Sequence, residues 1–85
     1  MTKQEQMSLF IKNIRPYLKN RIDKKELQGL TYDDIDKMRI NFQETESHGL
    51  RPFIDESVVN KLSNDMINDY ETIWTSGLLK PDLLH

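Results

Sequence analysis

Residues 38–54 read MRINFQETESHGLRPFI, and they fit two kinds of secondary structure. The first is a helix. Ile35, Met38 and Phe42 have the spacing of three and four residues that places side chains on one helix face. His48, which a glycine follows, would then end the helix, since glycine is common just past a helix C-terminus. On this interpretation the chain is all-helical.

The second interpretation of the same stretch is a β-hairpin. Met38, Ile40 and Phe42 alternate with polar residues, which is the pattern of a half-buried strand. Residues 50–54 would form the second extended segment and pair with the first. This alternative gives an α+β fold with a short hairpin around residues 37–54, and short apolar runs alone do not separate it from a helix.

A helix start signal comes just before this stretch. Thr31 is followed three residues later by Asp34, so the threonine hydroxyl is placed to accept a hydrogen bond from the first helical turn. Asp33 and Asp36 add negative charge near the positive end of the helix dipole. A helix is therefore predicted to begin after Thr31.

The N-terminal part of the chain has a helical stripe of apolar residues. Thr2 is the predicted N-cap, with Glu5 in the capping-box position. Pro16 interrupts the pattern: either the helix kinks there, or a second helix starts at Pro16 and runs to Gly29. The stripe consists of Met7, Phe10, Ile11, Ile14 and Leu18.

The last predicted helix lies after Pro52. Asp55 or Ser57 would cap it, and Gly77 would end it ahead of Pro81. Its apolar residues are Val58, Val59, Leu62, Met66, Ile67, Tyr70, Ile73 and Trp74. Together these segments favour an all-α fold, a small bundle of three or four helices.

Length and composition predict one small domain over residues 1–85. The chain is 36% hydrophobic and 31% charged, which is typical of a folded protein. A domain of this size buries only about 60% of its unfolded surface, so a partner or a second copy would add needed stability. Residues 1–14 are a candidate flexible N-terminal peptide, and residues 78–85 a candidate C-terminal tail. The chain has no cysteine, which excludes disulfides and thiolate metal sites.

Charge is distributed unevenly along the chain. Residues 1–30 hold seven cations and three anions, whereas the remainder holds five cations and eleven anions. The basic part suggests an alternative function, a nucleic-acid-binding regulator, although the pI near 5.6 weighs against it. The residues that would contact nucleic acid are Lys12, Arg15, Lys19, Arg21, Lys24 and Lys25.

The sequence shows no recognisable catalytic, cofactor or metal site. Its two histidines, His48 and His85, are too far apart for a metal pair at helical spacing. Asp34 and Asp36 begin like a calcium loop, but Arg39 stands where that loop requires glycine. The apolar runs are far shorter than the roughly 20 residues that span a bilayer. We therefore expect a non-enzymatic, cytoplasmic protein with no cofactor and no membrane contact.

Residues 6–10 read QMSLF. This pentapeptide resembles the short peptide through which bacterial polymerases, mismatch-repair proteins and replication regulators dock on the sliding clamp. The resemblance implies that Leu9 and Phe10 fill an apolar pocket, while Gln6 hydrogen-bonds at the rim and Met7 makes a secondary contact. Such docking requires an extended, accessible backbone. The helical stripe uses Met7 and Phe10 as core residues instead, so the two interpretations conflict.

The C-terminal segment offers a second apolar surface. Leu78 and Leu79 precede Pro81, and two more leucines follow it. With Trp74 they are the candidate surface for self-association or for packing on another protein. The leading expectation is a small protein-binding module, a regulator or accessory subunit of a larger bacterial or phage machine. The sliding clamp is the most specific candidate partner, and a homo-oligomer is a further option.

Overall fold

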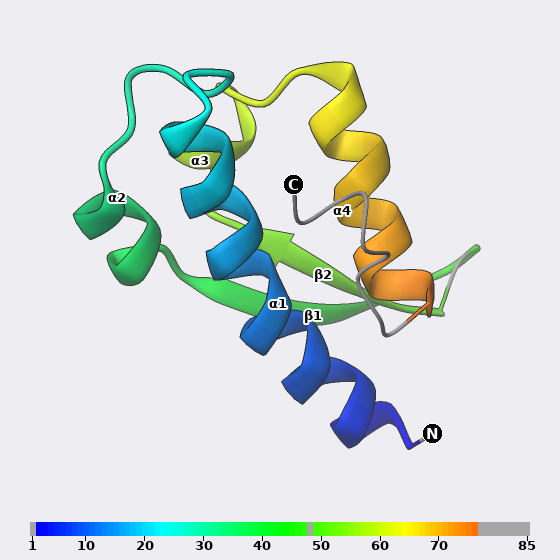
Figure 1. Cartoon of the computed structure of the whole chain (residues 1–85). Coiled ribbons are helices and arrows are strands. Elements are labelled where there is room, and N and C mark those ends of the chain that lie inside the picture. Colours follow the sequence, from blue (N-terminus) through cyan, green and yellow to red (C-terminus); the bar gives the residue numbers. More distant parts are fainter. Residues whose placement is uncertain (1, 48, 77–85) are drawn as a thin grey trace.

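A computed structural model describes residues 2–47 and 49–76, which form four helices and one β-hairpin (Figure 1). None of the helices in this described part is long and apolar enough to cross a membrane. The elements in chain order are α1 (Lys3–Asp23), α2 (Tyr32–Lys37), β1 (Ile40–Thr45), β2 (Gly49–Ile54), α3 (Glu56–Val59) and α4 (Asn64–Ser76).

The hairpin corrects the all-α prediction and matches the α+β alternative. Strands β1 and β2 pair antiparallel, with Phe42 opposite Pro52. The helix that begins after Thr31 ends at Lys37 instead of continuing to His48, because Met38 has an extended backbone. Burial explains the outcome, since Phe42 is half-buried in the strand while the polar residues beside it are exposed. The predicted number of helices is right, but they do not form a simple bundle.

Helix α2 starts as the sequence predicts. The Thr31 hydroxyl accepts a hydrogen bond from the Asp34 backbone N–H at 3.2 Å. The Asp34 carboxylate accepts one in return from the Thr31 backbone N–H at 2.8 Å, which completes a capping box. The bond from the Thr31 N–H favours the ionised form of the Asp34 carboxyl group and lowers its pKa. The cap fixes the start of a helix of only six residues, whose Ile35 is fully buried.

Helix α1 is one continuous element, and the second helix from Pro16 to Gly29 does not form. The Thr2 hydroxyl caps the helix by accepting a hydrogen bond from the Glu5 N–H at 3.1 Å, as predicted. Pro16 lies inside the helix and cannot donate the usual bond to the carbonyl of Lys12. Buried residues on both sides of Pro16 pack into one core, and this packing holds the two halves of the helix together. They are Phe10, Ile14, Tyr17 and Leu18.

The predicted C-terminal helix is divided into α3 and α4. Asp55 does not cap α3 with its side chain, because its carboxylate accepts a hydrogen bond from the Arg39 backbone N–H at 2.7 Å. The hydroxyl of Ser63 accepts a bond from the Met66 N–H at 3.3 Å and so caps the start of α4. The break at residues 60–63 lets the two helices take different directions beside β2 (Figure 1).

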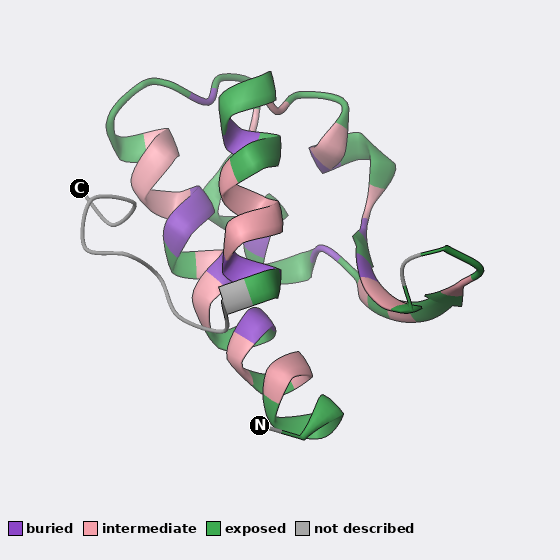
Figure 2. Ribbon diagram, turned by 90° about the vertical axis from the view of Figure 1, so that its right-hand side faces the viewer, coloured by how far each residue is buried: buried purple, intermediate pink, exposed green. Residues whose placement is uncertain are grey.

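One hydrophobic core joins α1, the hairpin and α4. Buried positions, purple in Figure 2, recur along α1 and reappear on α4. The ring of Phe10 lies at the centre of an aromatic cluster, with edge-to-face contacts to the rings of Phe42, Tyr70 and Trp74 at centroid distances of 6.1, 5.2 and 5.9 Å. The buried residues are Phe10, Ile14, Tyr17, Leu18, Leu27, Ile35, Met38, Ile54, Val58, Met66, Ile73 and Trp74.

Candidate functional site

The QMSLF segment belongs to the first turns of α1. Phe10 is fully buried, and Met7 packs against the core. The side-chain amide of Gln6 donates a hydrogen bond to the backbone carbonyl of Trp74 at 2.8 Å. Leu9 is only half-buried. The segment is therefore not the extended peptide that clamp docking needs, because Phe10 fills the core of the domain. For the same reason it is not part of a flexible N-terminal peptide over residues 1–14.

The predicted C-terminal surface is only partly described. Trp74 is 4% exposed, so its indole contributes to the core and not to a surface. Leu78 and Leu79 lie outside the described residues, as does the rest of the candidate tail over residues 78–85. Trp74 is therefore a core residue and not the centre of an exposed contact surface.

Partners within the chain hold several of the cations predicted to contact nucleic acid. Arg15 donates hydrogen bonds to the backbone carbonyls of Ile35 and Met38, at 3.3 and 3.2 Å. Lys19 forms an ion pair with Asp36 at 2.7 Å. Arg21 pairs with both Glu26 and Asp69.

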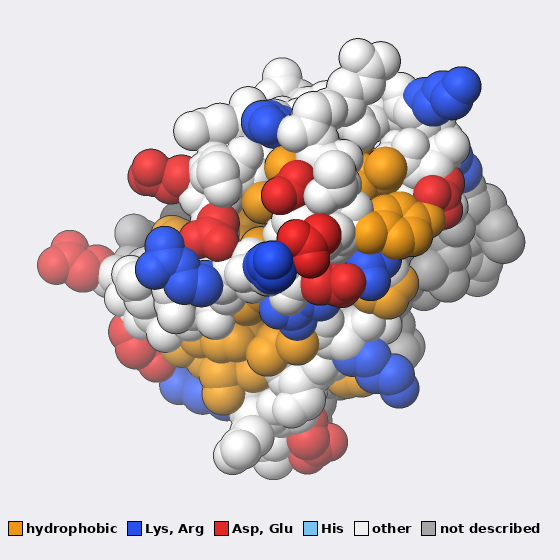
Figure 3. All heavy atoms as spheres, turned by 90° about the vertical axis from the view of Figure 1, so that its left-hand side faces the viewer, with side chains coloured by type: hydrophobic (Ala, Val, Ile, Leu, Met, Phe, Trp, Pro, Cys, Tyr) orange, Lys and Arg blue, Asp and Glu red, His pale blue; other side chains and the backbone are white. Residues whose placement is uncertain are grey.

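Lys12, Lys24 and Lys25 complete this set of cations, and all three are exposed. On the face shown in Figure 3, Lys and Arg side chains alternate with Asp and Glu side chains. This face therefore presents mixed charge and not a basic patch of the kind that binds phosphates.

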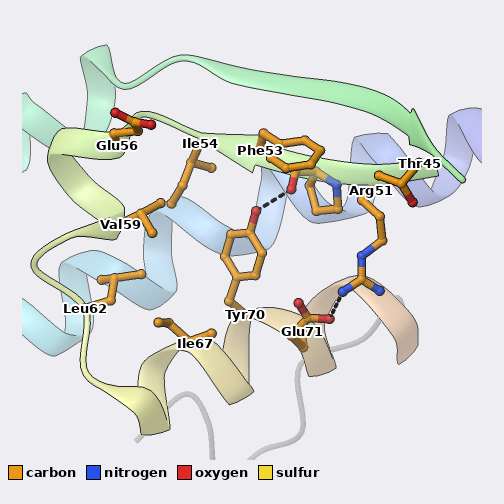
Figure 4. Close-up of a pocket in the computed structure, with 11 residues that line it drawn as sticks. Thr45, Arg51, Phe53, Ile54, Glu56, Val59, Leu62, Ile67, Tyr70 and Glu71 are labelled. Carbon is orange, nitrogen blue, oxygen red and sulfur yellow. Dashed lines mark hydrogen bonds and ion pairs between the residues drawn. The ribbon is translucent and has the colours of Figure 1, made fainter. Parts of the chain in front are cut away.

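A largely apolar groove lies between β2, α3 and α4 (Figure 4). Its volume is about 380 Å³. Phe53 of β2 and Ile67 of α4 line it from opposite sides, and they remain 43% and 37% exposed. The full lining consists of Thr45, Arg51, Pro52, Phe53, Ile54, Glu56, Val59, Leu62, Ile67, Tyr70 and Glu71. Two large apolar side chains thus face solvent within one hollow.

Tyr70 stands between α4 and β2 in this groove. Its hydroxyl donates a hydrogen bond to the carbonyl of Pro52 at 2.6 Å. Burial, helped by the nearby charge of Glu71, raises the pKa of Tyr70 to about 12, so the hydroxyl stays protonated near neutral pH. At the end of the groove near Thr45, Arg51 forms an ion pair with Glu71 (Figure 4). These polar groups are therefore already bound to each other or to the backbone.

The outer edge of β2 is interrupted at Pro52, where a further strand would lack a backbone donor. The Asp55 N–H donates to the Arg39 carbonyl at 3.2 Å, which makes these two residues a hydrogen-bonded pair. Such pairs alternate along an antiparallel ladder, so the pair of Phe42 and Pro52 is not hydrogen-bonded and Pro52 directs its carbonyl outward. Proline has no N–H, and Tyr70 occupies its carbonyl. An added strand would find no N–H donor at this position and would share the carbonyl with Tyr70.

The sequence pattern predicts one helix where the structure has α3 and α4, so it does not reveal the groove. That single helix would place Val59 and Ile67 on its buried stripe. The sequence does carry a signal for the break: Ser63, Asn64 and Asp65 are residues that favour helix N-termini, and they stand in the middle of the expected helix. A second helix start at this point turns part of the apolar stripe into the wall of a groove.

No metal centre is found among residues 2–47 and 49–76, where no three acidic or histidine side chains come close enough to hold an ion. Comparisons with protein-family models, with curated proteins and with solved structures gave no match. The functional argument therefore depends on the groove and its chemistry.

Proposed function

We propose that this chain is a small non-enzymatic protein-binding module, and that it accepts an apolar helical segment of a larger protein in the groove between β2, α3 and α4. The observation that carries the proposal is the joint exposure of Phe53 and Ile67 within one groove. Large apolar side chains that share an exposed hollow favour contact with apolar side chains of another molecule.

The chemistry of the lining favours a protein segment over a small polar ligand. Small-ligand sites place a few polar groups so that they orient the ligand. Here Tyr70 donates to the Pro52 carbonyl, and Arg51 is paired with Glu71. The side chains of the lining that remain available to a ligand are therefore largely apolar.

The interruption of the β2 edge at Pro52 favours a helix as the occupant. A segment that adds to a sheet relies on backbone hydrogen bonds along the edge. Pro52 lacks the N–H for such a bond, and its carbonyl is already occupied by Tyr70. A helix satisfies its own backbone and binds through side chains alone, which is the mode that this groove allows.

This proposal replaces the clamp-type peptide as the binding element. Docking through residues 6–10 would require Phe10 to leave the aromatic cluster of the core. The groove needs no such rearrangement, since Phe53 and Ile67 are exposed in the folded domain. A role as regulator or accessory subunit of a larger assembly is compatible with either binding element.

An NMR titration with a matched pair of variants tests the groove. The probe is a designed amphipathic helix of about 18 residues, with a leucine stripe and glutamine at the other positions. We expect it to shift the amide signals of Phe53, Ile67 and their neighbours in the wild-type chain. Ile67→Asp should abolish these shifts, because it places a charge in the apolar groove.

Ile11→Asp is the control, because Ile11 is 37% exposed on α1, as Ile67 is on α4. The control variant should bind as the wild type does. Circular dichroism establishes that both variants are folded. Absence of binding by the wild type, or equal loss in the two variants, would contradict the proposal.

A further inference from the structure

The helices that form two walls of the groove carry only negative charge. Helix α3 contains Glu56, and α4 contains Asp65, Asp69 and Glu71, with no Lys or Arg in either helix. Lys61, in the connection between them, donates a hydrogen bond to the Gly29 carbonyl at 2.7 Å. Of these carboxylates, Glu56 and Glu71 line the groove, whereas Asp69 binds Tyr17 and Arg21 of α1.

Two of these four carboxylates already have cationic partners. Asp69 is bound by Arg21 at 3.1 Å, and Glu71 is paired with Arg51. Glu56 and Asp65 are exposed, and within the described part of the chain neither forms an ion pair. Glu56 lies at the end of the groove opposite the pair of Arg51 and Glu71 (Figure 4).

From this charge distribution we infer that the occupant of the groove is a basic amphipathic helix of a partner protein. Its apolar face lies between Phe53 and Ile67, and a Lys or Arg at one end reaches Glu56. Complementary charge of this kind discriminates between apolar helices of opposite charge, because a like charge beside Glu56 is repelled. The inference rests on the proposed function, and it adds the class of helix that the groove prefers.

Three helical peptides with the same leucine stripe test this preference. The remaining positions are all lysine in the first peptide, all glutamine in the second and all glutamate in the third. Each peptide carries fluorescein, so that its binding to the full chain is measured by anisotropy. We expect the lysine peptide to bind roughly tenfold more tightly than the glutamate peptide at low salt. Raising the salt from about 50 mM to about 500 mM should remove most of this difference, because exposed charges are then screened.

Charge reversal in the chain provides the matched variant. Glu56→Lys should reduce the preference for the lysine peptide several-fold while leaving the affinity for the glutamine peptide unchanged. Glu46→Lys is the control, since it makes the same charge change at an exposed position outside the groove lining. It should keep the preference, so that overall net charge is separated from charge at the groove.

Each outcome decides between defined alternatives. Equal affinity for the three peptides would overturn the inference about charge but leave the proposed groove in place. Binding of none of them would overturn the proposed function as well. A concentration-dependent dimer in sedimentation, disrupted by Ile67→Asp, would replace the partner helix with a second copy of this chain. If Glu56→Lys and Glu46→Lys both lost the preference for the lysine peptide, the preference would come from the net charge of the chain, and the role of Glu56 would be overturned.

Discussion

Tyr17 is a fully buried residue whose hydroxyl depends on one partner. It donates a hydrogen bond to the Asp69 carboxylate at 2.5 Å, and Arg21 donates to the same oxygen. Burial, followed by the bond to Asp69, raises the pKa of Tyr17 well above its ordinary value of 10.0. We expect Tyr17→Phe to lower the free energy of unfolding by about 1–2 kcal/mol at pH 7, measured by urea denaturation.

The difference in free energy of unfolding between the wild type and Tyr17→Phe should also depend on pH, and the sign of this dependence follows from the raised pKa. A tyrosine whose folded-state pKa is raised stabilises the fold fully below the unfolded pKa, and this stabilisation is lost as the pH rises above it. The gap between wild type and Tyr17→Phe should therefore narrow by about 1.4 kcal/mol near pH 11. Tyr32→Phe is the control, because Tyr32 is 45% exposed and bonds Asp23 at the surface. A loss at pH 7 as large in the control as in Tyr17→Phe would contradict this account.

At the scale of elements, Pro16 is the feature of α1 that works against its helix. Pro16 is exposed within the helix and leaves the Lys12 carbonyl without its helical partner. We expect Pro16→Ala to raise the free energy of unfolding by about 1–2 kcal/mol, because the restored bond outweighs the greater freedom of the unfolded chain. Ser8→Ala, at another exposed position of α1, should change it by about 0.5 kcal/mol or less. If Pro16→Ala did not raise the free energy of unfolding, the bond missing at the Lys12 carbonyl would not be what limits the stability of α1.

The elements also show which parts of the structure the sequence could predict. Local signals were sufficient for the caps at Thr2 and Thr31, because capping bonds join residues only three positions apart. Local signals were insufficient at Phe42, because its distance along the sequence from the neighbouring apolar residues fits either a helix or a strand. The choice there depends on contact with Phe10, which lies far away in the sequence. The sequence signals the helix break at Ser63, but the groove itself depends on a distant contact, since it exists only where β2 and α4 come together.

At the scale of the whole molecule, the aromatic cluster links α1, β1 and α4. The ring of Phe10 touches one ring of β1 and two rings of α4, so loss of this one side chain affects three elements at once. Replacing a buried Phe by Ala costs about 3–5 kcal/mol. A domain of this length has a total stability of only about 4–13 kcal/mol. Phe10→Ala is therefore expected to bring the chain close to the unfolding threshold.

Two probes measure whether the molecule responds as one unit. Trp74 fluorescence reports on the cluster, and far-ultraviolet circular dichroism reports on the helices. In urea, both signals should change at one midpoint in the wild type, and both midpoints should fall together in Phe10→Ala. Leu9→Ala, at the adjacent half-buried position, should cost far less. If Phe10→Ala kept the stability of the wild type, Phe10 would be dispensable for the core and free to act as the anchor of a docking peptide.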